Sequence, residues 1–377
     1  MNQAGLPLNS IETPSFVVDL SLLRRNLAIL GGVQKKTGAR ILLAQKAFSM
    51  FSVYPMLAKV LCGTCASSPH EARLGREYFP AFAAAYSEQD LRELLPICDH
   101  IVFNSFSQWE RFRPLAMRYA DRVQFGLRVN PEHSEADTAI YDPCAPGSRL
   151  GILRSEFAGH DLSPFSGLHF HTLCEKNADS LERTLAAFEK KFGDLIGRMK
   201  WINFGGGHHI TRPDYDVELL CSLIRNFREK YGTEVYLEPG EAVALNTGYL
   251  VGTVLDTVRN GIDIAILDVS AATHMPDVLE MPYRPNNRTA TVWRDRRASR
   301  ETSSETIRST NRSAPATNWS SATWHTTQWS KPTRSTDSSS PPSQPGIPTQ
   351  RSTGSCAASP TTTSKQGSPE RWKKPFF

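Results

Sequence analysis

The chain has 377 residues, of which 40% are hydrophobic and 21% charged, and its formal net charge is +5. This composition is that of an ordinary globular protein, and no run approaches the roughly 18 apolar residues of a membrane span. The polar Met-Asn-Gln start and seven scattered cysteines argue against a signal peptide and a disulfide framework, so we expect a cytoplasmic protein with no membrane partner.

The chain divides into two unlike parts. Up to about Pro285 apolar runs alternate with amphipathic stretches, whereas residues 286–377 are dominated by Ser, Thr, Pro and Arg. Such a tail cannot bury enough apolar surface to offset the entropy cost of folding, which is roughly 1–2 kcal/mol per residue, and we expect it to be disordered. The tail supplies much of the positive charge, but it lacks the Lys/Arg clusters with aromatics that would predict a nucleic-acid partner.

In chain order, residues 16–20 form the first predicted strand, and a helix capped by Ser21 follows. Eight further β-rich runs are predicted at residues 41–44, 81–85, 100–103, 123–129, 167–171, 201–204, 234–237 and 264–267. Helical stretches between them are predicted at residues 88–95, 180–192 and 217–231. Strands that alternate with helices over this length predict a parallel sheet closed into a (β/α)8 barrel, in which chemistry lies where the strands end.

Several residues with chemical potential fall at such strand ends. Lys46 follows a buried run and is suited to Schiff-base chemistry, although a lone lysine is a weak signal. Gly205-Gly206-Gly207 could hold a phosphate group, although a glycine-rich turn is the commoner meaning. Arg128 also lies at a strand end. Only the joint order of these residues along a barrel favours a catalytic site.

The remaining strand-end residues are similarly ambiguous when taken alone. Glu238 is either a turn residue or the carboxylate that keeps a pyridine nitrogen protonated, and His171 is either a core histidine or a ring that faces a cofactor. The pair Cys62-x-x-Cys65 has no second pair nearby, and we interpret it as two incidental thiols; no metal site is predicted.

Over residues 10 to 285 the chain resembles the alanine-racemase-type barrel decarboxylases, which use pyridoxal 5′-phosphate (PLP). Within them it most resembles the carboxynorspermidine (carboxyspermidine) decarboxylases. The resemblance lies in the stretches LLAQKAFSM, ASSPHEARLG, AFAAAYSE, VFNSFSQWERF, LRVNPEHSE, GLHFHTLCE, NFGGGHHIT, LEPGEAV and HMPDVLEMPYRP. It implies a fold-type III PLP barrel over residues 1–285, a small polyamine substrate and a homodimer.

The resemblance also implies a role for each matching residue. Lys46 would be the Schiff-base lysine, His171 the ring on the pyridine face and Arg128 a contact on the phenolic side of the cofactor. The phosphate would lie at Gly205, Gly206 and Gly207, and Gly240 would also belong to the cofactor site. Glu238 would pair with the pyridine nitrogen, and Glu241, His274 and Asp277 would belong to the substrate site.

Some positions depart from the family pattern. Related decarboxylases carry Arg after Glu-Pro-Gly, whereas this chain has Glu241, a charge reversal that suits a substrate with extra amines. The stretch Ala271-Ala-Thr-His274 and the junction at residues 78–81 also differ. The family continues with a β-domain that supplies a catalytic cysteine across the dimer interface, and no such sequence is visible after Pro285.

The tail can be decoded in another reading frame. Read one base earlier with allowed third bases, residues 298–309 can spell CLAGDVIGDYSF, and residues 324–346 can spell MAHYTMVKTNTFNGLKLPSIAAW. Both strings look like the missing β-domain. We therefore interpret residues 286–377 as a frameshifted segment that leaves the chain inactive and its dimer impaired. The alternatives are another basic amino-acid decarboxylase of the same fold, or a non-catalytic PLP-binding remnant.

Overall fold

The computed structural model describes residues 8–75, 80–82, 85–136, 142–276, 279 and 291–295. All of them belong to one compact unit. They form two sheets, one parallel and one largely antiparallel. No helix in this described part of the chain is long and apolar enough to cross a lipid bilayer.

The parallel sheet is the barrel. Its eight strands are β2 (Arg40–Ala44), β3 (Gly63–Cys65), β4 (Pro80–Phe82), β5 (His100–Phe103), β6 (Gln124–Arg128), β7 (Phe165–His169), β8 (Trp201–Asn203) and β9 (Glu234–Leu237). They are hydrogen-bonded in the order β3-β2-β9-β8-β7-β6-β5-β4. The two outer strands, β3 and β4, follow one another in the sequence and are in contact, so the sheet curls into a ring with one seam.

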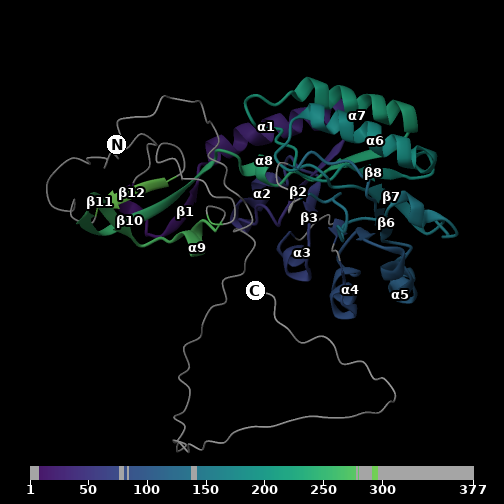
Figure 1. The fold of residues 1–377 in the computed structure, drawn as a ribbon, viewed down its shortest axis with the longest axis horizontal. Coiled ribbons are helices and arrows are strands. Elements are labelled where there is room, and N and C mark those ends of the chain that lie inside the picture. The colour runs from purple at the N-terminus through teal and green to yellow at the C-terminus, as the bar shows by residue number, and fades with distance from the viewer. Residues whose placement is uncertain are drawn as a thin grey trace, which may run out of the picture. The chain divides into compact units, whose positions relative to one another are not determined.

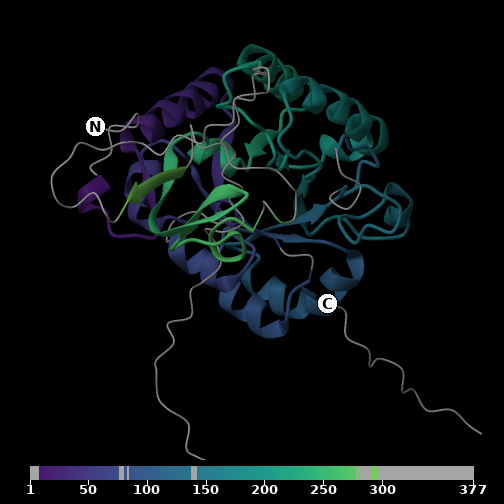
Figure 2. The ribbon, with the colours of Figure 1, turned by 60° about the vertical axis from the view of Figure 1, so that its left-hand side comes forward.

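Helices cover the outside of this ring, as Figure 2 shows. They are α1 (Leu20–Thr37), α2 (Tyr54–Leu57), α3 (Pro69–Gly75), α4 (Glu88–Leu94), α5 (Phe106–Ala116), α6 (Ala178–Ile196), α7 (Val217–Tyr231) and α8 (Glu241–Ala244). Helix α7 packs between α1 and α6 (Figure 1). Short 3-10 turns lie at Leu8–Ser10, Phe51–Val53, Met117–Tyr119 and Arg154–Phe157.

The start of α1 differs from the prediction. The cap is Asp19, whose carboxylate accepts hydrogen bonds from the backbone N–H groups of Ser21 (2.7 Å) and Leu22 (3.2 Å). Ser21 therefore lies inside the first turn. An aspartate directly before a helix satisfies N–H groups that have no partner within the helix, as a serine would.

The second sheet contains β1 (Ser15–Val18), β10 (Gly248–Asn260), β11 (Ile262–Leu267) and β12 (Thr291–Asp295). Strand β10 pairs antiparallel with β1 and β11 and parallel with β12. The run at residues 264–267, predicted as a barrel strand, is thus part of a hairpin, and the eighth barrel strand is β3, which was not predicted. Helix α9 (Ala271–His274) follows β11.

The described residues cover only part of the chain on the C-terminal side of the predicted division at residue 285. Five residues of the segment that we expected to be disordered form β12, and residues 296–377 lie outside the described residues. The division into a barrel and an out-of-frame tail stays a prediction.

The interior of the barrel is filled by Trp201. A Cβ atom at Gly167 would lie 2.1 Å from its indole ring, and one at Gly126 would lie 2.4 Å from it. Both glycines face Trp201 across adjacent strands because Gly126 pairs with Gly167 and Gly167 with Trp201. The indole N–H donates to the side-chain oxygen of Gln124 (3.0 Å). The barrel is therefore a packed core, and its chemistry lies above this layer.

Candidate active site

The predicted site residues come from neighbouring strands. Arg128 is the last residue of β6, and His171 follows β7 by two residues. The glycine loop follows β8, Glu238 follows β9 directly, and Lys46 follows β2 by two residues. Because β6, β7, β8, β9 and β2 are consecutive in the ring, the same end of the barrel receives all five features.

Glu238 is a buried carboxylate with several partners. Its Oε1 atom accepts a hydrogen bond from Asn203 Nδ2 at 2.7 Å, and its Oε2 atom lies 3.4 Å from His169 Nε2. Burial raises the pKa of Glu238, but the interactions with His169, Asn203 and Arg128 outweigh burial and hold the pKa below its ordinary value. Glu238 is therefore ionised in the interior, which suits a carboxylate that must keep a nearby proton in place.

His171 is held from two sides. Its Nδ1 atom accepts a hydrogen bond from the backbone N–H of Gly206 at 2.8 Å, and its carbonyl oxygen accepts one from Arg128 Nη2 at 3.2 Å. Burial, together with the positive charges of Arg128 and Lys46, lowers the pKa of His171 well below its ordinary value. The ring is thus neutral, and Nε2 carries its proton.

Arg128 lies inside the barrel with only 4% of its surface exposed. Burial lowers the pKa of its guanidinium to about 10, against the opposing pull of Glu238. Arg128 still remains charged at neutral pH. It is a fixed positive charge next to Glu238 and His171.

The glycine loop allows backbone to approach closely. Gly205 and Gly207 adopt φ values of +71° and +81°, and a Cβ at Gly207 would lie 2.0 Å from the carbonyl oxygen of Leu173. A Cβ at Gly206 would lie 2.5 Å from the carbonyl oxygen of Glu238. Only glycine fits this turn. Gly240 is equally restricted, because its Cβ would lie 2.2 Å from Ala47 Cβ.

Lys46 is exposed at the end of β2. Its positive charge lowers the pKa of His171. At Glu71, burial raises the pKa, and the charge of Lys46 partly offsets this rise. The residue before it, Gln45, is buried and donates to Thr64 Oγ1 at 3.1 Å. The lysine therefore follows a fixed strand end, and its charge is near enough to His171 to lower the pKa of that ring.

The predicted substrate residues do not all join this group. Glu241 begins α8, and its Oε2 atom lies 2.9 Å from His209 Nε2. His274 lies on α9, where its Nδ1 atom accepts from the backbone N–H of Ser270 (3.1 Å) and its ring lies 6.4 Å from that of Phe16. In the described part of the chain, no contact joins His274 to Lys46 or Glu238. Asp277 lies outside the described residues.

Three neighbours of the site were not predicted. Asn203 and His169 are the last residues of β8 and β7 and both contact Glu238. Cys65 ends β3, where burial and the charge of Glu238 raise the pKa of its thiol well above the ordinary value. For Asn203 and His169 the available signal was a polar residue at the end of an apolar run, whereas the short strand that ends at Cys65 carries no such run. Among the described residues no three His, Cys, Asp or Glu side chains gather in a way that could hold a metal ion.

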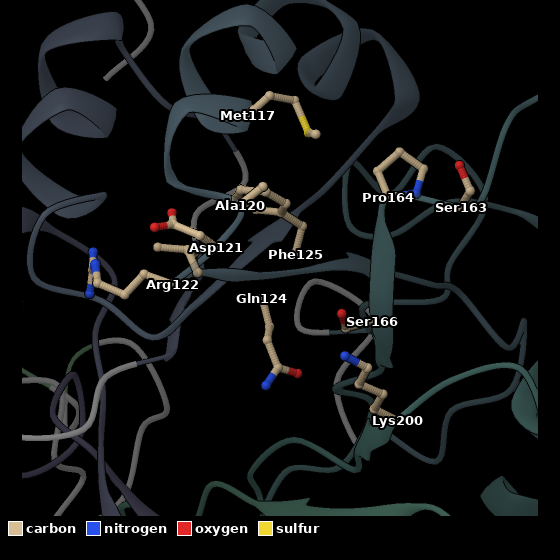
Figure 3. Close-up of a pocket in the computed structure, with 11 residues that line it drawn as sticks. Met117, Ala120, Asp121, Arg122, Gln124, Phe125, Ser163, Pro164, Ser166 and Lys200 are labelled. Atoms are coloured by element: carbon tan, nitrogen blue, oxygen red, sulfur yellow. The ribbon is translucent and has the colours of Figure 1, made fainter.

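A cavity of about 390 Å³ lies at the opposite end of the barrel. It is lined by the starts of β6 and β7 and the residue before β8, and Figure 3 shows Gln124, Ser166 and Lys200 around it. This cavity is distant from the C-terminal strand ends that carry Glu238 and Lys46. It is therefore not the place where the predicted residues meet.

The chain is 44% identical over 277 residues to the carboxynorspermidine/carboxyspermidine decarboxylase of Campylobacter jejuni, a match that covers 72% of each chain. It is 41% identical over 291 residues to the carboxyaminopropylagmatine decarboxylase of Synechocystis, which covers 76% of this chain and 75% of the relative. The carboxynorspermidine/carboxyspermidine decarboxylase of Herminiimonas arsenicoxydans is 35% identical, with 71% and 74% covered. In the comparison with models of protein families, none matches the chain.

Solved structures of related decarboxylases also resemble this chain. The carboxynorspermidine decarboxylase from Campylobacter jejuni, complexed with norspermidine, superposes with a TM-score of 0.67 at 42% identity and covers 73% of this chain and 72% of its own. The diaminopimelate decarboxylase from Helicobacter pylori, complexed with L-lysine, gives 0.64 at 16% identity, covering 76% and 80%. The second likeness shows the fold alone. Together they confirm the predicted barrel fold.

Proposed function

The chain belongs to the carboxynorspermidine/carboxyspermidine decarboxylase family of polyamine biosynthesis, and from this premise we propose that its barrel binds PLP and removes CO2 from carboxynorspermidine or carboxyspermidine. The observation that carries the proposal is the buried, ionised Glu238 on the strand next to that of Lys46. A buried anion at the barrel mouth is what a protonated pyridine nitrogen requires, and the exposed lysine after the neighbouring strand offers an amine for cofactor attachment.

The residues present fit PLP. Lys46 offers an exposed amine for covalent attachment of the cofactor aldehyde. The glycine turn packs directly on the loop that follows β7, because a Cβ at Gly205 would lie 2.4 Å from the carbonyl oxygen of Phe170. Bound PLP supplies an electron sink for the electron pair that remains when CO2 leaves.

Each side chain has one task in this proposal. Glu238 accepts a hydrogen bond from the protonated pyridine nitrogen and holds that proton. His171, fixed by Gly206 and Arg128, presents a neutral ring to one face of the cofactor. The N–H groups of Gly205 and Gly206 already donate to Asn203 and His171. Phosphate binding therefore relies on other amides of the two loops, such as those of Gly207 and Gly240.

Glu241 is proposed to bind the substrate, together with His274 and Asp277. His209 orients the Glu241 carboxylate. The preceding residue, Gly240, packs against Ala47, the residue after Lys46, so Glu241 lies close to the end of β2. A negative charge at this place favours the amines of a polyamine substrate over a second carboxylate. The relative from Synechocystis makes carboxyaminopropylagmatine a third candidate substrate.

The sequence of residues 286–377 decides whether the 377-residue chain can be active. The matches leave about a quarter of this chain and of each relative uncovered, a share that a changed segment over residues 286–377 would account for. We propose that this segment is out of frame and replaces a β-domain that would complete the site within a homodimer. Loss of a positioned proton donor alone would lower the rate by about 10²–10⁴-fold.

The test is to express the chain as given beside a version whose reading frame is restored after Pro285. CO2 release is measured with carboxynorspermidine, carboxyspermidine and carboxyaminopropylagmatine, and diaminopimelate serves as the control substrate. The restored chain is expected to release CO2 from one or more of the three amines and to be more soluble. Equal activity from the unrestored chain would refute the frameshift interpretation, and turnover of diaminopimelate alone would refute the proposed substrate class.

A further inference from the structure

A row of polar residues lies inside the barrel below the proposed site. Arg128, His169 and Asn203 are the last residues of β6, β7 and β8, and they are direct register partners. Asn203 pairs in turn with Tyr236, two residues before Glu238, so Glu238 lies one layer higher on the same side of β9. Asn203 and His169 are each 2% exposed. Groups buried this deeply need hydrogen-bond partners.

Both ends of the Asn203 side chain are used. Nδ2 donates to Glu238 Oε1 at 2.7 Å, and Oδ1 accepts from the backbone N–H of Gly205 at 2.8 Å. The orientation of the amide is unambiguous, because a carboxylate can only accept and a backbone N–H can only donate. The backbone N–H of Glu238 also donates to the carbonyl oxygen of Gly205 at 2.7 Å. Glu238 and Gly205 are thus tied together twice.

We propose that Asn203 is a positioning residue that fixes the Glu238 carboxylate to the glycine loop, so that the two ends of PLP are held by one rigid unit. The proposal rests on the proposed function insofar as PLP is the ligand. The pyridine nitrogen would meet Glu238 and the phosphate would meet the glycine loop. A side chain that connects these two places sets the distance between them.

The charges around Glu238 explain why residue 203 carries an amide and not a second carboxylate. The titratable groups that interact with Glu238 are His169 on β7, Arg128 on β6, Cys65 on β3 and His100 at the start of β5. Burial lowers the pKa of His169, so Arg128 is the permanent positive charge of the set. A second carboxylate in place of the Asn203 amide would face Glu238 directly, and one of the two would have to take up a proton.

The experiment exchanges the two groups. Asn203→Asp is compared with the double variant Asn203→Asp/Glu238→Gln, which restores one amide and one carboxylate in swapped positions. Thermal unfolding of the full chain without PLP is measured at pH 5 and pH 7. Asn203→Asp is expected to lower the melting temperature, and more so at pH 7 because both carboxyls then tend to ionise. The double variant is expected to recover more than half of that loss.

Asn104 provides a matched control. It follows β5, donates to the carbonyl oxygen of Arg149 at 2.8 Å and accepts from the N–H of Gly151 at 2.9 Å, which is the same two-ended bridge without a carboxylate partner. Asn104→Asp is expected to destabilise the chain, and adding Glu238→Gln should bring no recovery. Rescue of both aspartate variants, or of neither, would overturn the role of Asn203.

PLP titration followed by absorbance separates this inference from the proposed function. Asn203→Ala is expected to bind PLP about 10- to 100-fold more weakly than the unaltered chain, the range for losing one hydrogen bond to a charged group. Unchanged affinity in Asn203→Ala would overturn the inference. Failure of the unaltered chain to bind PLP would instead count against the proposed function, and the recovery in melting temperature would still decide whether Asn203 fixes Glu238.

Discussion

The two ends of the barrel differ in what the strands bring together. At the C-terminal ends, β7, β8 and β9 place His169, Asn203 and Glu238 in mutual contact, shielded from water. At the N-terminal ends, a cavity of about 390 Å³ opens among exposed side chains such as Lys200. Because burying a charge costs free energy unless hydrogen bonds offset that cost, the buried carboxylate indicates function more strongly than the cavity does.

Removing the lysine at the C-terminal end should have the largest effect. In the frame-restored chain, Lys46→Ala is expected to lower kcat by about 10⁴-fold or more, because the amine proposed to attach the cofactor is lost. CO2 release from carboxynorspermidine measures the effect. Activity within tenfold of the unaltered chain would contradict the assignment of Lys46.

Glu238→Ala should have the next largest effect. It is expected to lower kcat by about 10²–10³-fold, or roughly 3–4 kcal/mol, with little change in substrate binding, because the proposed role of Glu238 is to stabilise charge that develops in the transition state. The matched control is Glu234→Ala, which removes an exposed carboxylate from the other end of the same strand. Similar losses in the two variants would indicate that β9 is merely destabilised.

His208 makes the C-terminal end sensitive to acid. Burial lowers its pKa to about 4, whereas a histidine in the unfolded chain titrates near about 6.5. Between these values the unfolded state binds a proton that the folded state does not, so stability falls as the pH falls through this window. The loss reaches about 3 kcal/mol near pH 4. His208→Asn is expected to remove this acid-dependent loss. Urea unfolding at pH 7 and pH 4.5 measures the free energy of unfolding of the unaltered chain and of the variant, and equal losses between the two pH values would contradict the role of His208.

Lys200→Ala at the N-terminal cavity should have the smallest effect. An exposed substitution away from buried contacts usually changes stability by less than about 0.5 kcal/mol. PLP affinity and kcat of the frame-restored chain are expected to stay within twofold. A tenfold loss of either would mean that the cavity in Figure 3 belongs to the active site.

The sequence predicted the strongly periodic parts of the fold. Helix α7 has the predicted bounds, and β5 and β9 match as well, because long amphipathic stretches and apolar runs determine such elements locally. Strand β3 was missed because Gly63-Thr64-Cys65 has no apolar run. Strand β11 was assigned to the barrel because its composition resembles that of a barrel strand, whereas its antiparallel pairing with β10 depends on a hairpin turn at Gly261.

Candidate site residues could be named from the sequence only where a residue type indicates its own chemistry, and their roles stay predictions. The family resemblance gave Lys46, His171 and Glu238 their roles, and the strand ends bring these residues to one end of the barrel. The supporting residues Asn203 and His169 were not predicted, because their importance depends on contacts between strands. Glu238 lies 35 positions after Asn203 in the sequence. A one-dimensional pattern does not contain that contact.

The most direct test of the central claim is chemical trapping. The full chain is incubated with PLP, reduced with borohydride, digested and mapped by mass spectrometry, with Lys46→Ala and Lys200→Ala treated in parallel. The account predicts that the cofactor becomes fixed to the peptide that carries Lys46, that Lys46→Ala abolishes this label and that Lys200→Ala retains it. A label on any other lysine of the unaltered chain, or an undiminished label in Lys46→Ala, would contradict the account.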